Sequence, residues 1–207
     1  QEMRLGQKTP QTLVDLSGIQ GQSDSITQID ERILVGARVT HRQFIEHRLI
    51  NQHLTWLAQA AAKIGDVQVR NLGTVLGNLC WADPRANMAV AMMAGDATVI
   101  ATGDSDPEST VKIPLTEFFT GYQQNSLGSR LACGIELPIQ ANAQGVYLEF
   151  SRQPQDLALC NVCVVHDGQQ WRVAVGGIAE RAVRVLELEE KLSLSQTPDF
   201  LNALGRN

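Results

Sequence analysis

The sequence predicts a mixed α+β fold, in which a helix-containing first part precedes a second part dominated by antiparallel strands. Between Leu49 and Gly65, apolar residues recur at the spacing of one helix face and stop at a glycine. After Gly145, apolar and polar residues alternate instead, as they do in a strand with one buried face. Residues 158–165 and 171–175 are apolar runs that flank a polar turn, which is the arrangement of a β-hairpin.

The polar segment Gln140–Gln144 separates these two parts and marks the expected domain boundary. We therefore predict a first domain at residues 1–139 and a second at residues 140–207. A chain of 207 residues is long enough to bury a substantial core in such an arrangement.

The first domain is expected to open with short strands at Leu13–Leu16 and Ile33–Ala37. Thr40 and Gln43 have the spacing of a capping box, which starts a helix. The longest helical pattern follows, and we expect one continuous helix to end at Gly65.

A further helix is expected at Met88–Ala94, with Asp83 as its cap and Pro84 at its first position. Pro138 is expected to stop the last strand of this domain, because proline cannot donate to a sheet ladder. The remaining expected elements are strands at 97–101, 111–114 and 131–137 and a turn-rich segment at 115–122.

The second domain is expected to hold a three-stranded antiparallel sheet and a closing helix. The strands are expected at 146–150, 158–165 and 171–175. An apolar stripe at helical spacing follows, formed by Val183, Leu186, Leu188 and Leu192. A last turn of helix is expected at Pro198–Leu204.

The composition indicates a soluble protein without a polyanionic partner. Hydrophobic residues make up 43% of the chain and charged residues 19%, and the net charge of -5 leaves no broadly basic surface for nucleic acid or anionic membrane. No apolar run approaches the ~20 residues of a membrane span, and the start Gln1–Arg4 lacks the apolar core of a signal peptide. We therefore expect a cytoplasmic protein that binds neither nucleic acid nor membrane.

The stretch Val69–Asn87 has the most specific chemical interpretation. Gly73, Thr74, Gly77 and Asn78 lie close together between two helical patterns, and a glycine turn of this kind exposes backbone amides. Consecutive amides curled into a nest supply positive partial charge, and small residues let a phosphate approach the main chain. The segment predicts a site for a phosphate-bearing cofactor; the alternative is an ordinary glycine turn.

Residues 70–78 read R-N-L-G-T-V-L-G-N and are followed by Ala82-Asp83-Pro84. This stretch resembles the flavin motif R-N-x-G-T-x-G-G-N and A-D-P-x-x-D of the FAD-binding medium subunits of molybdenum hydroxylases, the xanthine dehydrogenase and carbon monoxide dehydrogenase group. Other segments resemble the same family in the same order and span most of the chain. They are Val39–His41, Phe118–Tyr122, Ile135–Pro138, Phe150–Arg152 with Asp156–Ala158, and Val175–Ala179.

The resemblance implies an FAD-binding α/β domain of the vanillyl-alcohol-oxidase type, followed by a small domain with an antiparallel sheet. It also implies a role in electron transfer, in which a molybdenum-cofactor large subunit hydroxylates the substrate and an iron-sulfur small subunit passes single electrons to FAD, which serves an external acceptor. The expected partners are these two subunits in a hetero-oligomer. The chain's own part would be to bind, orient and tune the flavin, so no residue is assigned a catalytic role.

The resemblance assigns seven residues to the cofactor. Thr74 through Asn78 would line the FAD diphosphate, and Asn87 falls where the family usually has an Asp that contacts the adenosine part. The full set is Gly73, Thr74, Val75, Leu76, Gly77, Asn78 and Asn87.

Five residues depart from the family pattern, two of them being Gln153 and Gln155 in place of the usual Arg and Gly. Leu76 replaces a glycine, and its branched side chain is expected to obstruct a left-handed backbone or a close phosphate, so that Leu76→Gly should raise flavin affinity. Asn87 in place of Asp loses a charge-assisted hydrogen bond, worth about 1 kcal/mol more than a neutral one. Glu149 stands near a position where the family has a Lys beside the isoalloxazine.

The chain also lacks the family's opening βαβ unit, whose glycine loop forms the other half of the diphosphate site, and its final helical segment. We therefore expect a fragment or a truncated form. Two rival functions stand beside the flavoprotein. One is a flavin-free docking module of the same fold, which the departures at Leu76, Asn87 and Glu149 and the missing loop favour. The other is a free-standing protein that binds a different nucleotide.

No metal site is expected. Cys160 and Cys163 have the C-x-x-C spacing of metal and redox sites, but the alternation around them predicts a buried strand, and we expect reduced thiols. The histidines His41, His47 and His53 fall on different faces of a helix and are expected at the surface. Asp104-Ser105-Asp106 lacks the later ligands of a calcium loop.

Overall fold

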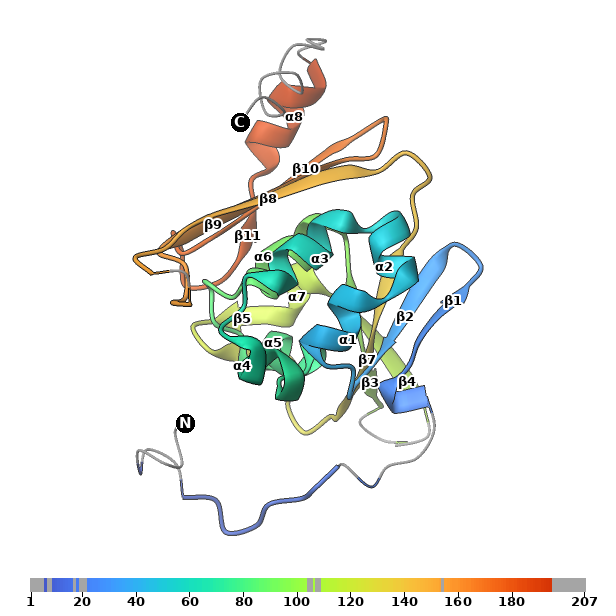
Figure 1. Ribbon diagram of the computed structural model, residues 1–207, viewed down its shortest axis with the longest axis vertical. Helices are drawn as coiled ribbons and strands as arrows, with labels where there is room; N and C mark the ends of the chain where they lie inside the picture. Colours follow the sequence, from blue (N-terminus) through green and yellow to red (C-terminus); the bar gives the residue numbers. More distant parts are fainter. Residues whose placement is uncertain are drawn as a thin grey trace.

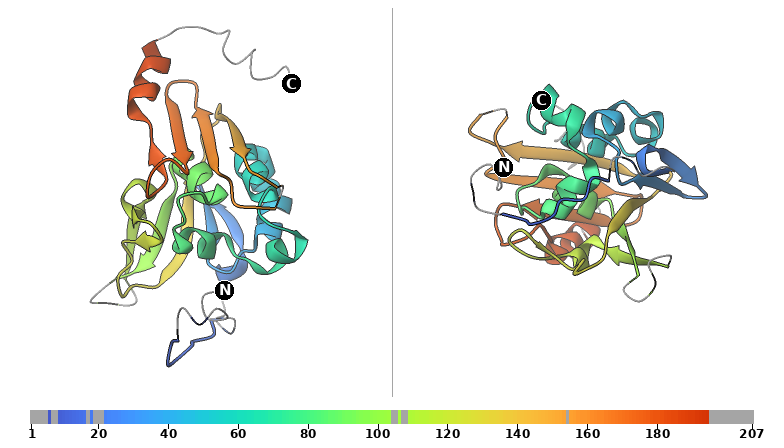
Figure 2. Two further views of the ribbon diagram at one scale, coloured as in Figure 1. Left: turned by 90° about the vertical axis from the view of Figure 1, so that its left-hand side faces the viewer. Right: turned by 90° about the horizontal axis from the view of Figure 1, so that it is seen from below.

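The computed structural model describes residues 6, 9–16, 18, 22–103, 106, 109–153 and 155–194. The chain forms three layers, in which helices lie between a five-stranded and a four-stranded antiparallel sheet (Figure 1). Figure 2 shows the same layers from the side. The extended segment 9–16 lies at one end of the molecule, and helix α8 (Leu186–Leu194) lies at the other.

The five-stranded sheet has the order β1-β2-β7-β3-β4, with every pair antiparallel. Its inner face presents Ile33, Val99 and Ile135 to the helices, because side chains alternate across a strand and these three are buried. The strands are β1 (Ile26–Ile29), β2 (Arg32–Gly36), β3 (Thr98–Thr102), β4 (Thr110–Pro114) and β7 (Ala132–Pro138).

The helices are shorter and more numerous than the sequence predicts. The capping box of Thr40 and Gln43 is confirmed and starts α1. The single helix expected from Leu49 to Gly65 is wrong, because Leu54 leaves the helical conformation, so that α2 ends at His53 and α3 begins at Thr55. The helical elements up to α7 are η1 (Gln22–Asp24), α1 (His41–Glu46), α2 (Arg48–His53), α3 (Thr55–Ala62), α4 (Val67–Leu72), α5 (Val75–Trp81), α6 (Asn87–Ala94) and α7 (Leu115–Phe118).

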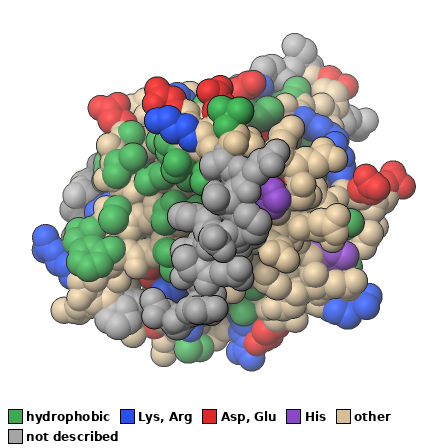
Figure 3. Space-filling model, turned by 90° about the horizontal axis from the view of Figure 1, so that it is seen from above, with side chains coloured by type: hydrophobic (Ala, Val, Ile, Leu, Met, Phe, Trp, Pro, Cys, Tyr) green, Lys and Arg blue, Asp and Glu red, His purple; other side chains and the backbone are tan. Residues whose placement is uncertain are grey.

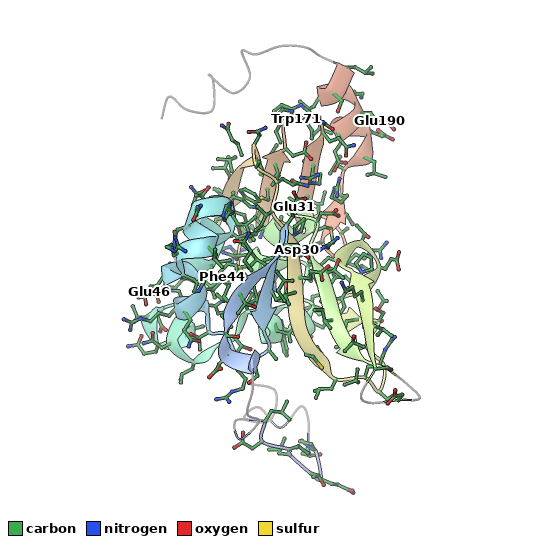
Figure 4. All side chains as sticks on the ribbon, turned by 90° about the vertical axis from the view of Figure 1, so that its right-hand side faces the viewer. Asp30, Glu31, Phe44, Glu46, Trp171 and Glu190 are labelled. Carbon is green, nitrogen blue, oxygen red and sulfur yellow. The ribbon has the colours of Figure 1, made fainter. Side chains whose placement is uncertain are left out.

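Most of the helices turn an apolar face inward, whereas α4 has no buried residue. Phe44 of α1 is fully buried, whereas Glu46, one half-turn later, points away from the body of the molecule (Figure 4). The eight residues of α6 are all buried, because the four-stranded sheet covers one side of this helix and helices α3, α5 and α7 pack around the rest. A small hairpin of β5 (Phe119–Gly121) and β6 (Gln124–Asn125) follows α7.

The expected cap of α6 is wrong. The N-cap residue is Ala86, which makes no capping hydrogen bond with its side chain, and the helix begins at Asn87. Asp83 instead accepts hydrogen bonds from the amide and guanidinium of Arg85, which closes a turn before the helix. Asp83, Pro84 and Arg85 thus form a hydrogen-bonded turn before α6 and are not part of its first turn.

The four-stranded sheet has the order β11-β10-β9-β8. The predicted hairpin is confirmed, with His166 opposite Trp171 at its end. The sequence predicts three strands, and the fourth, β11, contains Val183, which was expected in the closing helix. The strands are β8 (Gln144–Phe150), β9 (Cys160–His166), β10 (Trp171–Gly176) and β11 (Val183–Arg184).

This sheet is fixed to the helical layer by polar as well as apolar contacts. Arg172, buried on β10, donates to the carbonyl of Ala94 at the end of α6 at 3.1 Å and pairs with Asp167 at 2.9 Å. Trp56 of α3 packs so closely on Gly145 that a Cβ there would lie 2.5 Å from the indole ring. The two sheets therefore share one helical layer.

The outer face of the four-stranded sheet carries exposed hydrophobic side chains, among them Leu148 and Phe150, and Figure 3 shows green side chains gathered there. The expected inward stripe of α8 is wrong: Leu186 and Leu188 are exposed, and Glu189 is the buried residue of this helix. Glu189 accepts from the Val173 amide at 2.8 Å, which anchors the helix to β10.

Two expectations concern the ends of the chain. The strand expected at Leu13–Leu16 is wrong, because this segment pairs with no strand and Leu13 and Val14 are exposed. The helical turn expected at Pro198–Leu204 lies outside the described residues. The division into domains 1–139 and 140–207 stays a prediction.

Candidate cofactor-binding site

The segment Gly73–Val75 is held against Val39–His41 as a short antiparallel bridge. The His41 amide donates to the Gly73 carbonyl at 2.9 Å, and the Val75 amide donates to the Val39 carbonyl at 3.0 Å. Thr40 and Thr74 face each other between these two hydrogen bonds. Segments Val39–His41 and Gly73–Val75, which are far apart in sequence, therefore pair in the fold. The backbone of Val39–His41 fixes the position of Gly73–Val75.

Thr74 caps α5 and gives the motif its local structure. Its Oγ1 accepts from the Gly77 amide at 3.1 Å, and its carbonyl accepts from the Asn78 amide at 3.0 Å. The expected concave nest of amides is therefore wrong, because those of Val75, Gly77 and Asn78 already have acceptors. Within the described part of the chain, the amides of Thr74 and Leu76 have none.

The two glycines of the motif make room for the chain itself. Gly73 has φ of -68°, and a Cβ there would lie 2.9 Å from the Val69 carbonyl. A Cβ at Gly77 would lie 2.7 Å from Thr74 Oγ1, the atom that caps the helix. Both positions favour glycine because of close approach and not because of a left-handed backbone.

Leu76 lies in the first turn of α5, and its side chain is only 3% exposed. The expected obstruction of a left-handed backbone is wrong, since the residue is helical and its φ is not positive. The side chain belongs to the hydrophobic core together with Val75 and Leu79. The Leu76 side chain therefore packs in the core. That the seven assigned residues bind the flavin stays a prediction.

A cavity of about 820 Å³ opens beside Thr74 on the outer face of the five-stranded sheet. Leu34, Ile100 and Gly134 form its floor, and Thr40 and Thr74 lie at its edge. Its volume falls in the range of about 300–1,000 Å³ that is typical of ligand sites. Of the seven residues assigned from sequence, only Thr74 lines this cavity.

The residues present fit a phosphate-bearing cofactor. The two unpaired amides lie at the start of a helix, where the peptide dipoles favour an anion. The side-chain oxygen of Asn78 is buried and accepts no hydrogen bond from the described residues, although Asn78 does not line the cavity. Val75, Gly77 and the backbone of Asn78 would contribute shape and not hydrogen bonds.

Asn87 is not at the cavity but in a buried polar network between the helices and the four-stranded sheet. Its Nδ2 donates to the Ala60 carbonyl at 3.3 Å and to Glu149 Oε2 at 2.9 Å. Tyr147 also donates to Glu149, at 3.0 Å, and accepts from Asn161 at 3.0 Å. Burial raises the pKa of Tyr147 above its usual range, so the phenol stays a donor. The network was not predicted from sequence.

The turn Ala82–Arg85 is the point at which three motif segments converge. The Gln123 amide donates to the Ala82 carbonyl at 3.0 Å, and the Gly177 amide donates to the Pro84 carbonyl at 3.2 Å. Asn161 Nδ2 donates to the Arg85 carbonyl at 3.0 Å. Ala82, Gln123 and Gly177 all have positive φ, so each of the three segments turns sharply at this corner.

His41 is buried, which contradicts the surface position expected for it. Burial, with a smaller effect of the nearby Arg70, lowers the pKa of His41 to about 4, so the imidazole is neutral at pH 7. Its Nδ1 has no partner among the described residues. The ring packs beneath the motif, since a Cβ at Gly73 would come within 3.3 Å of His41 Cδ2.

The C-x-x-C pair does not form a site. Cys163 is buried and Cys160 exposed, because residues three apart in a strand lie on opposite faces, and the predicted strand is confirmed. Among the described residues no group of three or more metal-ligating side chains comes together. None of the described helices is both long and apolar enough to span a bilayer.

Sequence reasoning missed the residues that support the motif. Val39 and His41 were noted only as a family-like segment, although their backbone pairing positions Gly73 and Val75. The capping box at Thr40 was the available signal, since it fixes the chain entering α1 beside the motif. The polar contacts of Tyr147 and Asn161 link distant segments, and no local pattern indicates them.

A sequence profile described as the FAD binding domain in molybdopterin dehydrogenase matches residues 1–140. The chain is 32% identical over 191 residues to the 6-hydroxypseudooxynicotine dehydrogenase complex subunit alpha of Paenarthrobacter nicotinovorans. It is 26% identical over 166 residues to the glyceraldehyde dehydrogenase medium chain of Sulfolobus acidocaldarius. These matches cover 88% and 77% of this chain, and 63% and 58% of the two relatives.

Solved structures of similar sequence have the same fold as this chain. A chain of the carbon monoxide dehydrogenase of Hydrogenophaga pseudoflava superposes with a TM-score of 0.82 at 26% identity, over 88% of this chain and 65% of that one. A chain of quinoline 2-oxidoreductase from Pseudomonas putida 86 gives 0.83 at 25% identity, over 91% and 67%. The predicted fold class and the choice of FAD as cofactor are confirmed. The chain belongs to the family of FAD-binding domains of molybdopterin dehydrogenases.

Proposed function

We propose that this chain is the FAD-binding, electron-transferring part of a multi-subunit molybdenum hydroxylase. In this proposal an iron-sulfur subunit donates the electrons, a molybdenum subunit oxidises the substrate, and an external acceptor removes the electrons in the cytoplasm. The relatives named as medium or alpha subunits of dehydrogenases support it. The single observation that carries it in this chain is the start of α5, where the amides of Thr74 and Leu76 have no acceptor among the described residues and Thr74 lines a cofactor-sized cavity.

The chain's own residues would bind and orient the cofactor. The amides of Thr74 and Leu76 would receive the diphosphate, in a segment that the bridge to Val39 and His41 holds in place. The Asn78 side-chain oxygen would accept a hydrogen bond from the cofactor. FAD, once bound, supplies the ability to gather two electrons delivered singly. The protein's part is binding, orientation and the exclusion of water.

The visible spectrum of protein purified without added flavin tests this proposal. We expect the two absorbance bands of oxidised flavin, either directly or after incubation with excess FAD. Thr74→Ala should weaken FAD binding and cost about 1 kcal/mol of stability, because it removes the helix cap. Thr74→Ser is the matched control, since it keeps the capping hydroxyl and should bind FAD like the parent. FAD affinity unchanged in Thr74→Ala would contradict the assigned site.

A flavin-free docking module is the second candidate. Asn87 favours it, because both hydrogen atoms of its amide nitrogen are engaged by Ala60 and Glu149 and are not available to an adenosine group. A protein that shows no flavin bands even with excess FAD, yet copurifies with the other two subunits, would establish this second function and exclude the first.

A further inference from the structure

His41 lies directly behind one wall of the large cavity. Thr40, the residue before it, and Leu72 and Thr74, on either side of Gly73, all line this cavity. The His41 side chain is only 2% exposed and is not among the groups that line the cavity. The imidazole therefore occupies the core side of a wall whose other side faces the proposed cofactor.

His41 contacts Gly73 with both its main chain and its ring. Its amide donates to the Gly73 carbonyl at 2.9 Å. A Cβ at Gly73 would lie 3.3 Å from Cδ2 and 3.6 Å from Nε2 of the imidazole, and 2.9 Å from the Val69 carbonyl oxygen. Gly73 is therefore confined between the ring and α4, and its backbone cannot sink towards the core while the ring is in place.

The segment Gly73–Val75 is fixed at both ends by main-chain hydrogen bonds. His41 binds Gly73 at one end, and the Val75 amide donates to the Val39 carbonyl at 3.0 Å at the other. Thr74 lies between these two hydrogen bonds. The ring beneath Gly73 is thus the part of the core that limits how deep Thr74 can lie.

The Nδ1 atom of His41 is buried and has no hydrogen-bond partner within the described part of the chain. A buried polar atom without a partner destabilises the fold, and an aliphatic side chain in the same space would avoid this cost. Packing alone therefore does not account for an imidazole at this position. The flat edge that the ring presents to Gly73 does.

The groups around His41 keep its ring uncharged. Helices α2, α3 and α4 pack against α1. Helix α3 has no charged residue, α2 has Arg48 and His53, and α4 has Arg70. Burial and, to a smaller extent, the Arg70 guanidinium lower the pKa of His41 to about 4. The neutral ring therefore stays in the core at pH 7 and keeps its contact with Gly73.

We propose that His41 is a positioning residue for the cofactor: its buried ring supports Gly73 from beneath and thereby keeps Leu72 and Thr74 where FAD needs them. The inference rests on the proposed function and adds a residue that acts on FAD through Gly73 without touching it. Because this support exists before the cofactor arrives, FAD does not have to order the wall when it binds, which raises its affinity.

Titration of the flavin-free protein with FAD, followed by flavin fluorescence, tests the role of His41. His41→Ala should weaken FAD binding at least about tenfold, because the space beneath Gly73 opens and the wall can sink. His41→Gln should bind within about threefold of the parent, since its planar amide has a similar reach and restores the support. His41→Leu keeps the core filled and folded if His41→Ala does not fold. It should still weaken binding, because a branched side chain presents no flat edge to Gly73.

Ile50→Ala is the matched control for a loss of stability alone. Ile50 is also fully buried, but it lies on α2 and does not line the cavity. Its truncation should lower the melting temperature and leave FAD affinity unchanged, when affinity is measured at a temperature at which circular dichroism shows every variant folded.

The outcomes separate the two proposals. FAD affinity unchanged in both His41→Ala and His41→Leu would overturn the positioning role and leave the flavoprotein intact. Equal weakening in His41→Ala and Ile50→Ala would also overturn it, because the loss would then follow stability. A parent protein that binds no FAD would overturn the proposed function itself, and that result is read from the parent alone.

Discussion

Asn87 Nδ2 donates a hydrogen bond to Glu149 Oε2 at 2.9 Å, so two residues that the resemblance singled out as departures in charge contact each other. Asn87 begins α6, and Glu149 lies on the inner face of β8, where both side chains are nearly excluded from solvent. Lys63 stands at 3.7 Å from the other carboxylate oxygen. An amide at position 87 can donate to Glu149, whereas a carboxylate there would repel it. The amide at position 87 and the carboxylate at position 149 are therefore matched to each other.

Asn87→Asp should destabilise the protein by roughly 2–4 kcal/mol at pH 7, because two carboxylates would meet in a buried site. Adding Glu149→Lys should recover at least half of this loss by forming an ion pair. Urea unfolding of both single variants and the double variant measures the coupling. The exposed Asn142→Asp is the control and should change stability little. Strictly additive effects would show that the two side chains do not interact.

Leu76→Gly should lower stability by about 3–5 kcal/mol, because it opens a cavity in the core and places glycine in a helix. It should not raise flavin affinity, contrary to the expectation from sequence. Urea unfolding and FAD titration of the same sample test both statements. Leu72→Gly, at an exposed position of α4, should cost far less. Tighter FAD binding with unchanged stability would mean that Leu76 does obstruct the cofactor.

Stability should fall as the pH drops from about 6.5 towards 4, because His41 binds a proton in the unfolded chain before it does so in the folded one. The full effect of this one group is about 3 kcal/mol and is absent above pH 7. Urea unfolding at pH 7 and pH 5 should give a smaller difference for His41→Gln than for the parent. His53→Gln serves as the control. An identical pH dependence in all three proteins would rule out a buried neutral His41.

Gly176→Ala should destabilise the contact between the four-stranded sheet and the turn Ala82–Arg85. The added Cβ would collide with Asn161 Oδ1 and the Pro84 carbonyl and would lie 2.6 Å from Val90. We expect a loss of roughly 2–3 kcal/mol, seen as a lower melting temperature. At Gly95 the same substitution meets nothing closer than 3.5 Å and should be tolerated. Comparable melting temperatures for both variants would argue against the close packing at Gly176.

Most strands of the two sheets were predictable because they carry their own periodic pattern, but β1 was not predicted. Ile33–Ala37 and 131–137 were recognised from their apolar character, and the hairpin of β9 and β10 from its alternation and polar turn. The helices were less predictable. A continuous apolar stripe conceals the break at Leu54, which no glycine or proline marks. Strand β11 is two residues long, so its pairing comes from the neighbouring strand and not from its own sequence.

The location of the candidate site stays a prediction, and its local geometry was not predictable from the sequence. The glycines of 73–78 are required by close contacts to Val69 and Thr74 and not by a turn that exposes amides. Leu76 shows the same limit: a side chain that looks obstructive in a motif turns inward once the segment is helical. Contacts between distant segments, such as Asn87 with Glu149, leave no trace in local spacing.

The complete burial of α6 has a consequence for how the chain is made. All eight residues of α6 are buried. Strands β9 and β10, which cover one side of this helix, are synthesised some 70 residues later. During translation, the apolar surface of α6 is therefore exposed until β9 and β10 have been synthesised and have left the ribosome. Folding is therefore expected to complete late, through contacts of large sequence separation, and a nascent chain stalled before residue 160 would present α6 as a binding segment for chaperones.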